Sequence, residues 1–470
     1  MLFEDMPLSF YDKAERKAHK AFELYEDGKI PQALSELEAA LEINPSNSSW
    51  HFNKALGLDA MSKFADAIAE YEIALQLSPN DLEILNSLAV DYTRTGQYDL
   101  AIETFEQIQQ LDPKFEPCYC NRIITYTEMD QHDLAEQMFY LAQQISPDCA
   151  LCYYNIGNSL FARCEYKKAI RCWQRTAELE PAHPEINYRI AQAYWSQGDS
   201  AKAREHFLAE LRANPGDVDV IFDFGLLLLE AGEIESAKEK FHRILELKED
   251  FAPALFYLGE IAFNSSDYEK AADLYNQALQ NDNTLKGPYY RLAQHSLTTG
   301  QKQKARTYLV TELHTGPEDV DVFVSMASMF LKTGDYDQAI HCLLQAVDID
   351  SSNADAYYYL GLASALRGEL EDAGEFFSHS LDISREHAWA LRDSAIVYMA
   401  MHRLAQATDS IKKAMALVRD DAQLRLLNRK VRLAQARERI GDFVRRFGPA
   451  SIRRLTSHIS YLASRFPHRN

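Results

Sequence analysis

The sequence almost lacks stretches in which valine, isoleucine or threonine alternate with polar residues, and this absence excludes a protein built mainly from β-strands. Alanine, leucine, glutamate, glutamine and lysine, which favour helices, are abundant along its whole length instead. Because 47% of the residues are apolar, disorder is excluded as the overall state of the chain. We therefore expect an all-α fold.

Long apolar runs are also missing. The most apolar stretch, residues 220–229, is too short to cross a bilayer and is interrupted by Asp223. Near the start, Glu4 and Asp5 stand where a secretory signal needs basic residues followed by an apolar segment. We expect a cytoplasmic protein, in which the seven cysteines stay reduced and form no disulfide framework.

Catalytic motifs are a third absence. The sequence contains no phosphate-binding loop of the G-x-x-x-x-G-K-[ST] type, no G-x-G-x-x-G and no H-E-x-x-H. Its histidines, such as His51 and His132, are scattered without the spacing of metal ligands. We expect no enzymatic activity, no catalytic residues and no cofactor.

What the sequence does contain is a repeat of 34 residues. Large apolar residues follow each repeated alanine by four positions, and small residues precede it by 12 positions except at Ile123. This pattern predicts two antiparallel helices that approach at the small residues, while the large side chain fills the adjacent groove. Glycines such as Gly28 and Gly96 predict the turn between the helices, and prolines such as Pro45 end the second helix. The twelve alanines are Ala33, Ala67, Ala101, Ala135, Ala169, Ala203, Ala237, Ala271, Ala305, Ala339, Ala373 and Ala407.

The period and these positions resemble the tetratricopeptide repeat (TPR) family over residues 14–421. The resemblance implies a right-handed, superhelical TPR solenoid of twelve helix-turn-helix repeats, with the first helices lining a concave groove. Residues 1–13 would form an N-terminal extension, residues 422–447 a capping helix, and residues 448–470 a basic amphipathic segment. The repeats would begin at Ala14, Ser48, Leu82, Glu116, Ala150, Pro184, Val218, Ala252, Lys286, Val320, Ala354 and Ala388.

The concave face of a TPR solenoid is the predicted binding site. The resemblance implies that positions 2, 5, 6, 9, 12 and 13 of each repeat face this groove, and repeats five to nine place aromatic residues there. Such side chains offer a large contact surface to an extended peptide, which predicts a scaffold or adaptor for protein binding. The alternative is that they pack against neighbouring first helices. The predicted partner-binding residues are Tyr154, Asn155, Asn158, Phe161, Tyr188, Arg189, Trp195, Phe222, Phe256 and Tyr290.

The charged residues at the groove positions indicate which class of partner the groove favours. In repeats two to twelve the six groove positions hold eleven acidic and five basic residues. A surface with this bias favours a neutral to basic protein or peptide and disfavours nucleic acid.

The end of the chain has the opposite charge. Residues 422–470 contain 12 lysines or arginines and 2 acidic residues, although the whole chain has a net charge of −21. Residues 451–466 predict a basic amphipathic helix that could lie on an anionic membrane surface, bind an acidic partner or fold back onto the repeats. The alternative function is therefore a regulatory or targeting subunit, tethered to a membrane or an enzyme through this helix.

The cysteines allow more than one interpretation. Cys149 and Cys152 are spaced as C-x-x-C, which fits a redox pair, half of a zinc site or simple packing. Because Cys118 and Cys152 occupy a repeat position that is mostly apolar elsewhere, we interpret them as packing residues and assign no metal. We expect Cys120 to face the groove. A zinc site made by Cys118, Cys149 and Cys152 is the alternative, and it lacks an evident fourth ligand.

Overall fold

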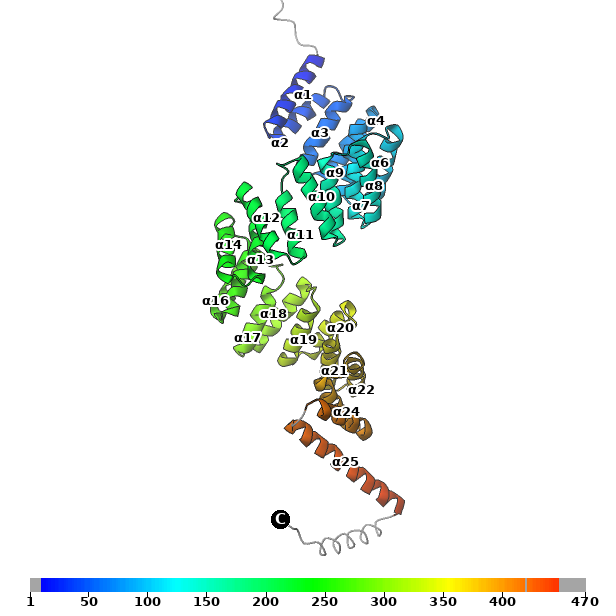
Figure 1. Cartoon of the computed structure of the whole chain (residues 1–470), viewed down its shortest axis with the longest axis vertical. Helices are drawn as coiled ribbons and strands as arrows, with labels where there is room; N and C mark the ends of the chain where they lie inside the picture. Colours follow the sequence, from blue (N-terminus) through cyan, green and yellow to red (C-terminus); the bar gives the residue numbers. More distant parts are fainter. Residues whose placement is uncertain (1–9, 419–420, 448–470) are drawn as a thin grey trace, which may run out of the picture. The chain divides into compact units, whose positions relative to one another are not determined.

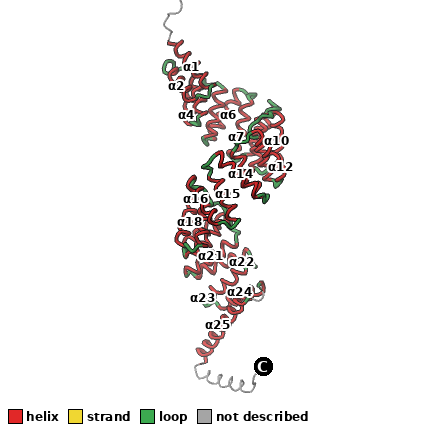
Figure 2. The backbone as a smooth tube through the Cα atoms, turned by 90° about the vertical axis from the view of Figure 1, so that its left-hand side faces the viewer, coloured by secondary structure: helices red, strands yellow, loops and turns green. Residues whose placement is uncertain are grey.

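A computed structural model describes residues 10–418 and 421–447, which form helices joined by short turns (Figures 1 and 2). No strand occurs within these two ranges. The predicted all-α TPR fold is confirmed, because helices follow one another in antiparallel pairs along the repeat. The first helices of the pairs are α1 (Phe10–Glu26), α3 (Ser48–Ala60), α5 (Leu82–Arg94), α7 (Glu116–Glu128), α9 (Ala150–Ala162), α11 (Ile186–Ser196), α13 (Val218–Glu230), α15 (Ala252–Asn264), α17 (Pro288–Thr298), α19 (Val320–Thr333), α21 (Ala354–Arg367) and α23 (Ala388–Ala400).

The second helices are slightly longer and more uniform. They are α2 (Ile30–Leu41), α4 (Phe64–Leu77), α6 (Tyr98–Leu111), α8 (His132–Ile145), α10 (Tyr166–Leu179), α12 (Ser200–Ala213), α14 (Ile234–Leu247), α16 (Tyr268–Asn281), α18 (Lys302–Thr315), α20 (Tyr336–Ile349), α22 (Leu370–Ile383) and α24 (Leu404–Leu417). A longer helix, α25 (Ala422–Phe447), follows the last pair.

The repeated alanines lie at the closest approach within each pair. All twelve are buried, and so is each large residue four positions later, from Leu37 and Tyr71 to Phe377 and Ile411. The small residue of the first helix leaves room for that large side chain. A Cβ atom on Gly157 would lie 2.7 Å from Trp173 Cδ1, so a larger residue does not fit there. Burying each large side chain contributes about 1.5–3 kcal/mol to stability.

The turn between the two helices requires a left-handed residue. Gly28, Gly96 and five further glycines at this repeat position have φ between 73° and 95°. Other repeats place a non-glycine residue there, and Ser62, Cys164 and Ser266 have φ of 58°, 60° and 65°. The predicted turn glycines are therefore confirmed, and the same turn also forms at some cost around other residues.

Two first helices begin later than the repeat predicts. From α3 onward, every first helix except α11 and α17 starts at the predicted residue. Helix α11 starts at Ile186 instead of Pro184, and α17 starts at Pro288 instead of Lys286. The cause is a left-handed residue just before each helix, Glu185 with φ of 60° and Gly287 with φ of 104°.

The chain divides into two compact units, Met1–Lys240 and Phe241–Asn470, and each has buried clusters of its own. In unit 1, one cluster surrounds Trp173 and another surrounds Phe105. In unit 2, the residues around Phe330 form a comparable cluster.

Helix α25 covers part of the last helix pair. Val431 is fully buried and packs with Ala395, Ala407 and Ile411, while Gln435 donates a hydrogen bond to Thr408 Oγ1 at 2.8 Å. The capping role of residues 422–447 stays a prediction, which rests on the need of a terminal repeat for a cover over its apolar face.

Candidate functional site

The ten predicted partner-binding residues lie on first helices of both units. Unit 1 contains Tyr154, Asn155, Asn158 and Phe161 on α9, Tyr188, Arg189 and Trp195 on α11, and Phe222 on α13. Unit 2 contains Phe256 on α15 and Tyr290 on α17. All seven aromatic members are half-buried. Each ring therefore packs in part against its neighbours and is in part accessible. Packing against neighbouring helices and contact with a peptide, the two interpretations of these residues, do not exclude each other.

On α9 the aromatic residues contact their own repeat. The Tyr154 ring lies 4.5 Å from the His183 ring, and Phe161 lies 5.3 Å from Tyr166 between ring centroids. Asn158 is half-buried and its side chain forms no hydrogen bond with the described residues. Its amide is thus available to a ligand.

Asn155 does not lie on an open surface. It is only 4% exposed, and its amide nitrogen donates a hydrogen bond to the carbonyl oxygen of Cys120 at 3.1 Å. We therefore place Asn155 in the packing between α7 and α9 rather than among groups that meet a partner directly. The reason is that position 6 of this repeat points toward the preceding first helix.

Helices α11 and α13 are joined by hydrogen bonds from aromatic side chains to carboxylates. The Tyr188 hydroxyl donates to Asp223 Oδ2 at 2.8 Å, and Gln192 Nε2 donates to the same oxygen at 3.0 Å. Trp195 Nε1 donates to Glu230 Oε2 at 2.5 Å. Burial and the neighbouring Asp223 carboxylate raise the pKa of Tyr188 well above its usual value, so its hydroxyl remains a donor. These bonds fix the orientation of both rings.

Arg189 is the basic member of this surface. It is half-buried, and its guanidinium lies 3.7 Å from the Glu185 carboxylate one turn earlier on the chain. Because both side chains are partly exposed, this ion pair contributes little stability.

In unit 2, Phe256 and Tyr290 have different neighbours. Phe256 contacts the Tyr275 ring at 5.8 Å between centroids. Tyr290 lies beside Arg291, whose guanidinium is 5.5 Å from the Tyr290 ring centre and forms two hydrogen bonds, at 2.8 and 2.5 Å, with the Glu260 carboxylate. An arginine bound to a carboxylate in this way offers less charge to a ligand.

The sequence reasoning missed the acidic partners of the aromatic residues. Asp223 and Glu230 each stand 35 residues after the side chain that donates to them. The same spacing links Tyr358 to Asp393 at 3.0 Å in unit 2. A tyrosine or tryptophan followed by an acidic residue 35 positions later is therefore a signal that could have been found in the sequence.

One interpretation of the cysteines agrees with the structure and one expectation is wrong. Cys118 is buried against the Phe105 carbonyl oxygen at 3.2 Å, as expected of a packing residue, so it does not join Cys149 and Cys152 in the alternative zinc site. Cys120 is buried rather than facing a groove, and its sulfur lies 2.9 Å from that of Cys152. The residues that bring possible metal ligands together are Glu116, Cys120, Cys149 and Cys152.

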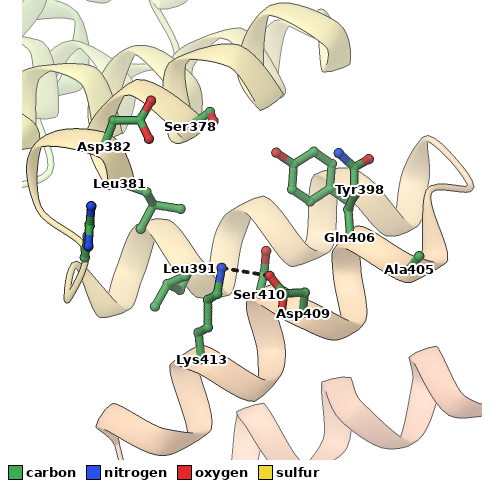
Figure 3. Close-up of a pocket in the computed structure, with 11 residues that line it drawn as sticks. Ser378, Leu381, Asp382, Leu391, Tyr398, Ala405, Gln406, Asp409, Ser410 and Lys413 are labelled. Atoms are coloured by element: carbon green, nitrogen blue, oxygen red, sulfur yellow. Dashed lines mark ion pairs between the residues drawn. The ribbon is translucent and has the colours of Figure 1, made fainter.

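A hollow of about 680 Å³ opens between α22, α23 and α24 in unit 2 (Figure 3). Leu381, Leu391 and Tyr398 supply apolar surface there, and Lys413 pairs with Asp409 at 2.8 Å. None of the ten predicted residues lines this hollow. Asp382 and Arg385 also line the hollow, and among its charged groups the described ion pair is that of Lys413 with Asp409.

Within the described residues, no helix combines the length and the apolar character needed to cross a membrane. The basic segment 448–470, on which the predicted membrane contact depends, lies outside the described residues.

Two family models match the chain. A model described as a tetratricopeptide repeat matches residues 53–114, 154–218 and 222–285. A second, described as a TPR repeat, matches residues 327–368. No curated protein matches the chain.

Several solved structures resemble this chain at low sequence identity. YrrB, described as a TPR protein with an unusual peptide-binding site, is 21% identical, and the match covers 41% of this chain and 99% of YrrB with a TM-score of 0.38. A tetratricopeptide repeat protein from Parabacteroides merdae is 18% identical, with 50% and 93% covered and a TM-score of 0.43. Yeast Tom70 is 14% identical, with 94% and 99% covered and a TM-score of 0.36.

Proposed function

Because the chain is a tetratricopeptide repeat protein, we propose that it is a non-enzymatic scaffold that binds an extended peptide or protein segment. Stacked repeats of this kind are scaffolds for protein–protein interaction, since their first helices build an extended binding surface. We assign the contact to the half-buried aromatic residues of α9, α11 and α13 in unit 1. We call this set the aromatic surface; it comprises Tyr154, Phe161, Tyr188, Trp195 and Phe222.

The observation that carries the proposal is the fixed orientation of Tyr188 and Trp195. Their hydrogen bonds to Asp223 and Glu230 order the rings before any ligand arrives. Ordering side chains in advance lowers the entropy lost on binding, and aromatic side chains supply most of the energy at many interfaces. Phe256 and Tyr290 are proposed as partner-binding residues of unit 2, considered by itself.

The charges around the aromatic surface favour a neutral to basic partner. Helix α13 carries Asp219, Asp223 and Glu230 beside the aromatic rings. Both hydrogen bonds to Asp223 end on Oδ2, and Oδ1 accepts none from the described residues. This oxygen can accept a hydrogen bond from a lysine, an arginine or a backbone amide of the ligand.

The test uses peptides of known composition. A displayed library of random peptides is selected on the immobilised full chain, and selection is repeated with the variant Trp195→Ser/Phe222→Ser. We expect enriched peptides to be neutral or basic and to lose binding to the variant, while circular dichroism shows unchanged helicity. The matched control is Tyr140→Ser, because Tyr140 is 55% exposed on the second helix α8. Equal enrichment on wild type and on the double variant would refute the proposal.

The alternative function, targeting through the basic helix of residues 451–466, stays a prediction from the sequence. Its support is the excess of ten positive charges after residue 421. Flotation with anionic vesicles, with and without residues 448–470, tests it. Equal flotation of both forms would argue against a membrane role.

A further inference from the structure

Four side chains that can bind a metal ion converge in unit 1, between α7 and the start of α9. The ligand atoms of Glu116, Cys120, Cys149 and Cys152 all lie within 4.8 Å of one another. We propose that these four residues bind one zinc ion, which holds the repeat of α7 and α8 against the repeat of α9 and α10. We refer to the four residues as the thiol cluster.

The chain brings the thiol cluster together from two local pairs. Glu116 and Cys120 are four residues apart on α7, so they share one face of that helix. Cys149 is the residue that precedes α9, and Cys152 lies in its first turn. Stacking of the two repeats then places the C-x-x-C pair against the helical pair. Paired ligands on two adjacent elements are the usual construction of a structural zinc site.

The distances suit a tetrahedral ion. The Cys152 sulfur lies 2.9 Å from the Cys120 sulfur and 3.0 Å from Glu116 Oε1. Zinc–sulfur bonds of about 2.3 Å separate two ligands of a tetrahedral site by about 3.8 Å. This separation is longer than the 2.9 Å between the Cys120 and Cys152 sulfurs and lies below the 4.8 Å within which all four ligand atoms fall. Small rotations of the side chains therefore suffice to surround the ion.

The surroundings hold the sulfurs in place. The backbone N–H of Cys152 donates to the Cys149 sulfur at 3.3 Å, which favours the thiolate form that binds metal. The Asn155 amide nitrogen lies 3.8 Å from the Cys120 sulfur while it donates to the Cys120 carbonyl oxygen. Partners of this kind orient metal ligands and strengthen binding. Cys120 and Cys152 are buried, while the half-buried Glu116 and Cys149 leave a path by which the ion enters.

Simple packing explains other cysteines better than these. Cys118 and Cys342 are buried among apolar residues, as expected of a small apolar side chain. Glu116, by contrast, is a half-buried carboxylate that forms no ion pair with any described residue, and the Cys152 thiol donates to its Oε1 at 3.0 Å. The carboxylate and the three sulfurs have no cationic partner, and a divalent cation bound among them would supply the missing positive charge. Three sulfur ligands select zinc over magnesium or calcium.

The experiment measures zinc in the purified full chain. After loading with zinc and dialysis against a zinc buffer of set free concentration, we expect one zinc ion per chain by mass spectrometry. The variant Cys149→Ser removes one ligand but keeps a good helix cap, because serine is a preferred residue at that position. Since loss of an outer-shell partner alone weakens metal binding by about 10–100-fold, we expect at least about 100-fold weaker zinc affinity in this variant.

The matched control is Cys164→Ser. Cys164 is exposed outside the thiol cluster, and Ser62 and Ser266 occupy the same left-handed turn position in other repeats. This variant should bind zinc like the wild type. Zinc should also slow amide hydrogen exchange in α7 and α9 of the wild type but not of Cys149→Ser, and cobalt in place of zinc should show the absorption of sulfur ligands.

Three outcomes would overturn the proposal. The first is a wild-type chain that retains no zinc at micromolar free concentration. The second is equal zinc affinity in the wild type and in Cys149→Ser. The third is a thiol titration, in denaturant with a zinc chelator, that counts fewer than the seven cysteines in protein purified without reductant, since this would indicate a disulfide in place of the metal site.

Discussion

The helix pairs α11–α12 in unit 1 and α17–α18 in unit 2 depart from the repeat in the same way. Each first helix starts two residues late, after Glu185 in one case and Gly287 in the other. In both pairs a glutamate of the second helix, Glu210 or Glu312, accepts hydrogen bonds from the backbone at this start. In both pairs, a glutamate stands at a repeat position of the second helix that is small or apolar in most other repeats. Its carboxylate accepts from backbone N–H groups at the start of the first helix, which have no acceptor within that helix.

The two pairs differ in how well this acceptor is placed. Glu312 is 1% exposed and accepts from the N–H of Gly287 at 2.6 Å and of Tyr290 at 3.0 Å. Glu210 is 8% exposed and accepts from the N–H of Tyr188 at 3.3 Å. Both carboxylates thus support helices that carry predicted partner-binding residues. The stronger arrangement belongs to the helix that begins at a proline, Pro288.

The largest expected effect is that of Glu312→Ala. The change leaves two backbone N–H groups without their acceptor, and each such loss costs about 1–3 kcal/mol. We expect the free energy of opening of α17, measured by native-state hydrogen exchange, to fall by about 2–4 kcal/mol. Glu210→Ala should lower that of α11 by only about 1 kcal/mol. Equal losses in the two helices would break the comparison.

The next effect is that of Gly287→Ala. A side chain at this backbone conformation is strained, and its Cβ would lie 2.9 Å from Phe256 Cζ. We expect the free energy of opening of α17 to fall by about 1–3 kcal/mol. Gly216→Ala is the control, because a Cβ there meets nothing within 4 Å and the residue is not left-handed. An unchanged Gly287→Ala protein would show that the left-handed start is not needed.

The pH dependence of α17 is a smaller effect. Burial raises the pKa of Glu312 above the unfolded value of about 4.3. The folded state therefore holds a proton that the unfolded state has released, and stability should fall as pH rises from about 4.3 through the raised pKa. Glu312→Gln should flatten this dependence of hydrogen exchange, after correction for intrinsic exchange rates. A slope of opposite sign would contradict the assignment.

The smallest effect should come from Glu185→Gly. Glycine adopts the left-handed conformation without strain, which should stabilise the folded variant by about 1–2 kcal/mol. Glycine also gives the unfolded chain more freedom, which should destabilise the folded variant by about 0.4–1 kcal/mol. The exposed pair with Arg189 contributes little. We expect the free energy of opening of α11, measured by hydrogen exchange, to rise by less than about 1 kcal/mol. A loss of stability would mean that Glu185 has a role beyond its backbone conformation.

The fold could be predicted from the sequence because its determinants are local and periodic. The alanine at every 34th position and the large residue after it, such as Ala169 and Trp173, specify each helix pair without reference to neighbouring repeats. The late starts of α11 and α17 depend instead on single departures, Glu185 and Gly287. These changes do not alter the period, so a reading of the period alone misses them.

The candidate site was predicted less completely, because its contacts join different repeats. Tyr188 was identified as an aromatic residue of the groove, but its partner Asp223 belongs to the next repeat. Cys120 and Cys152 likewise meet only because α7 and α9 stack, so counting positions within one repeat placed Cys120 in the groove. Contacts of this kind need the geometry of stacking, which the spacing of one repeat does not contain.

The aromatic surface is tested most directly by the affinity of one selected peptide. Its dissociation constant is measured by calorimetry for the wild type, for Trp195→Ser/Phe222→Ser and for the control Tyr140→Ser. Each lost aromatic contact of an interface centre costs about 2 kcal/mol or more. We therefore predict at least a hundredfold weaker binding by the double variant and unchanged binding by the control. Equal dissociation constants for the wild type and the double variant, at unchanged helicity, would contradict the account.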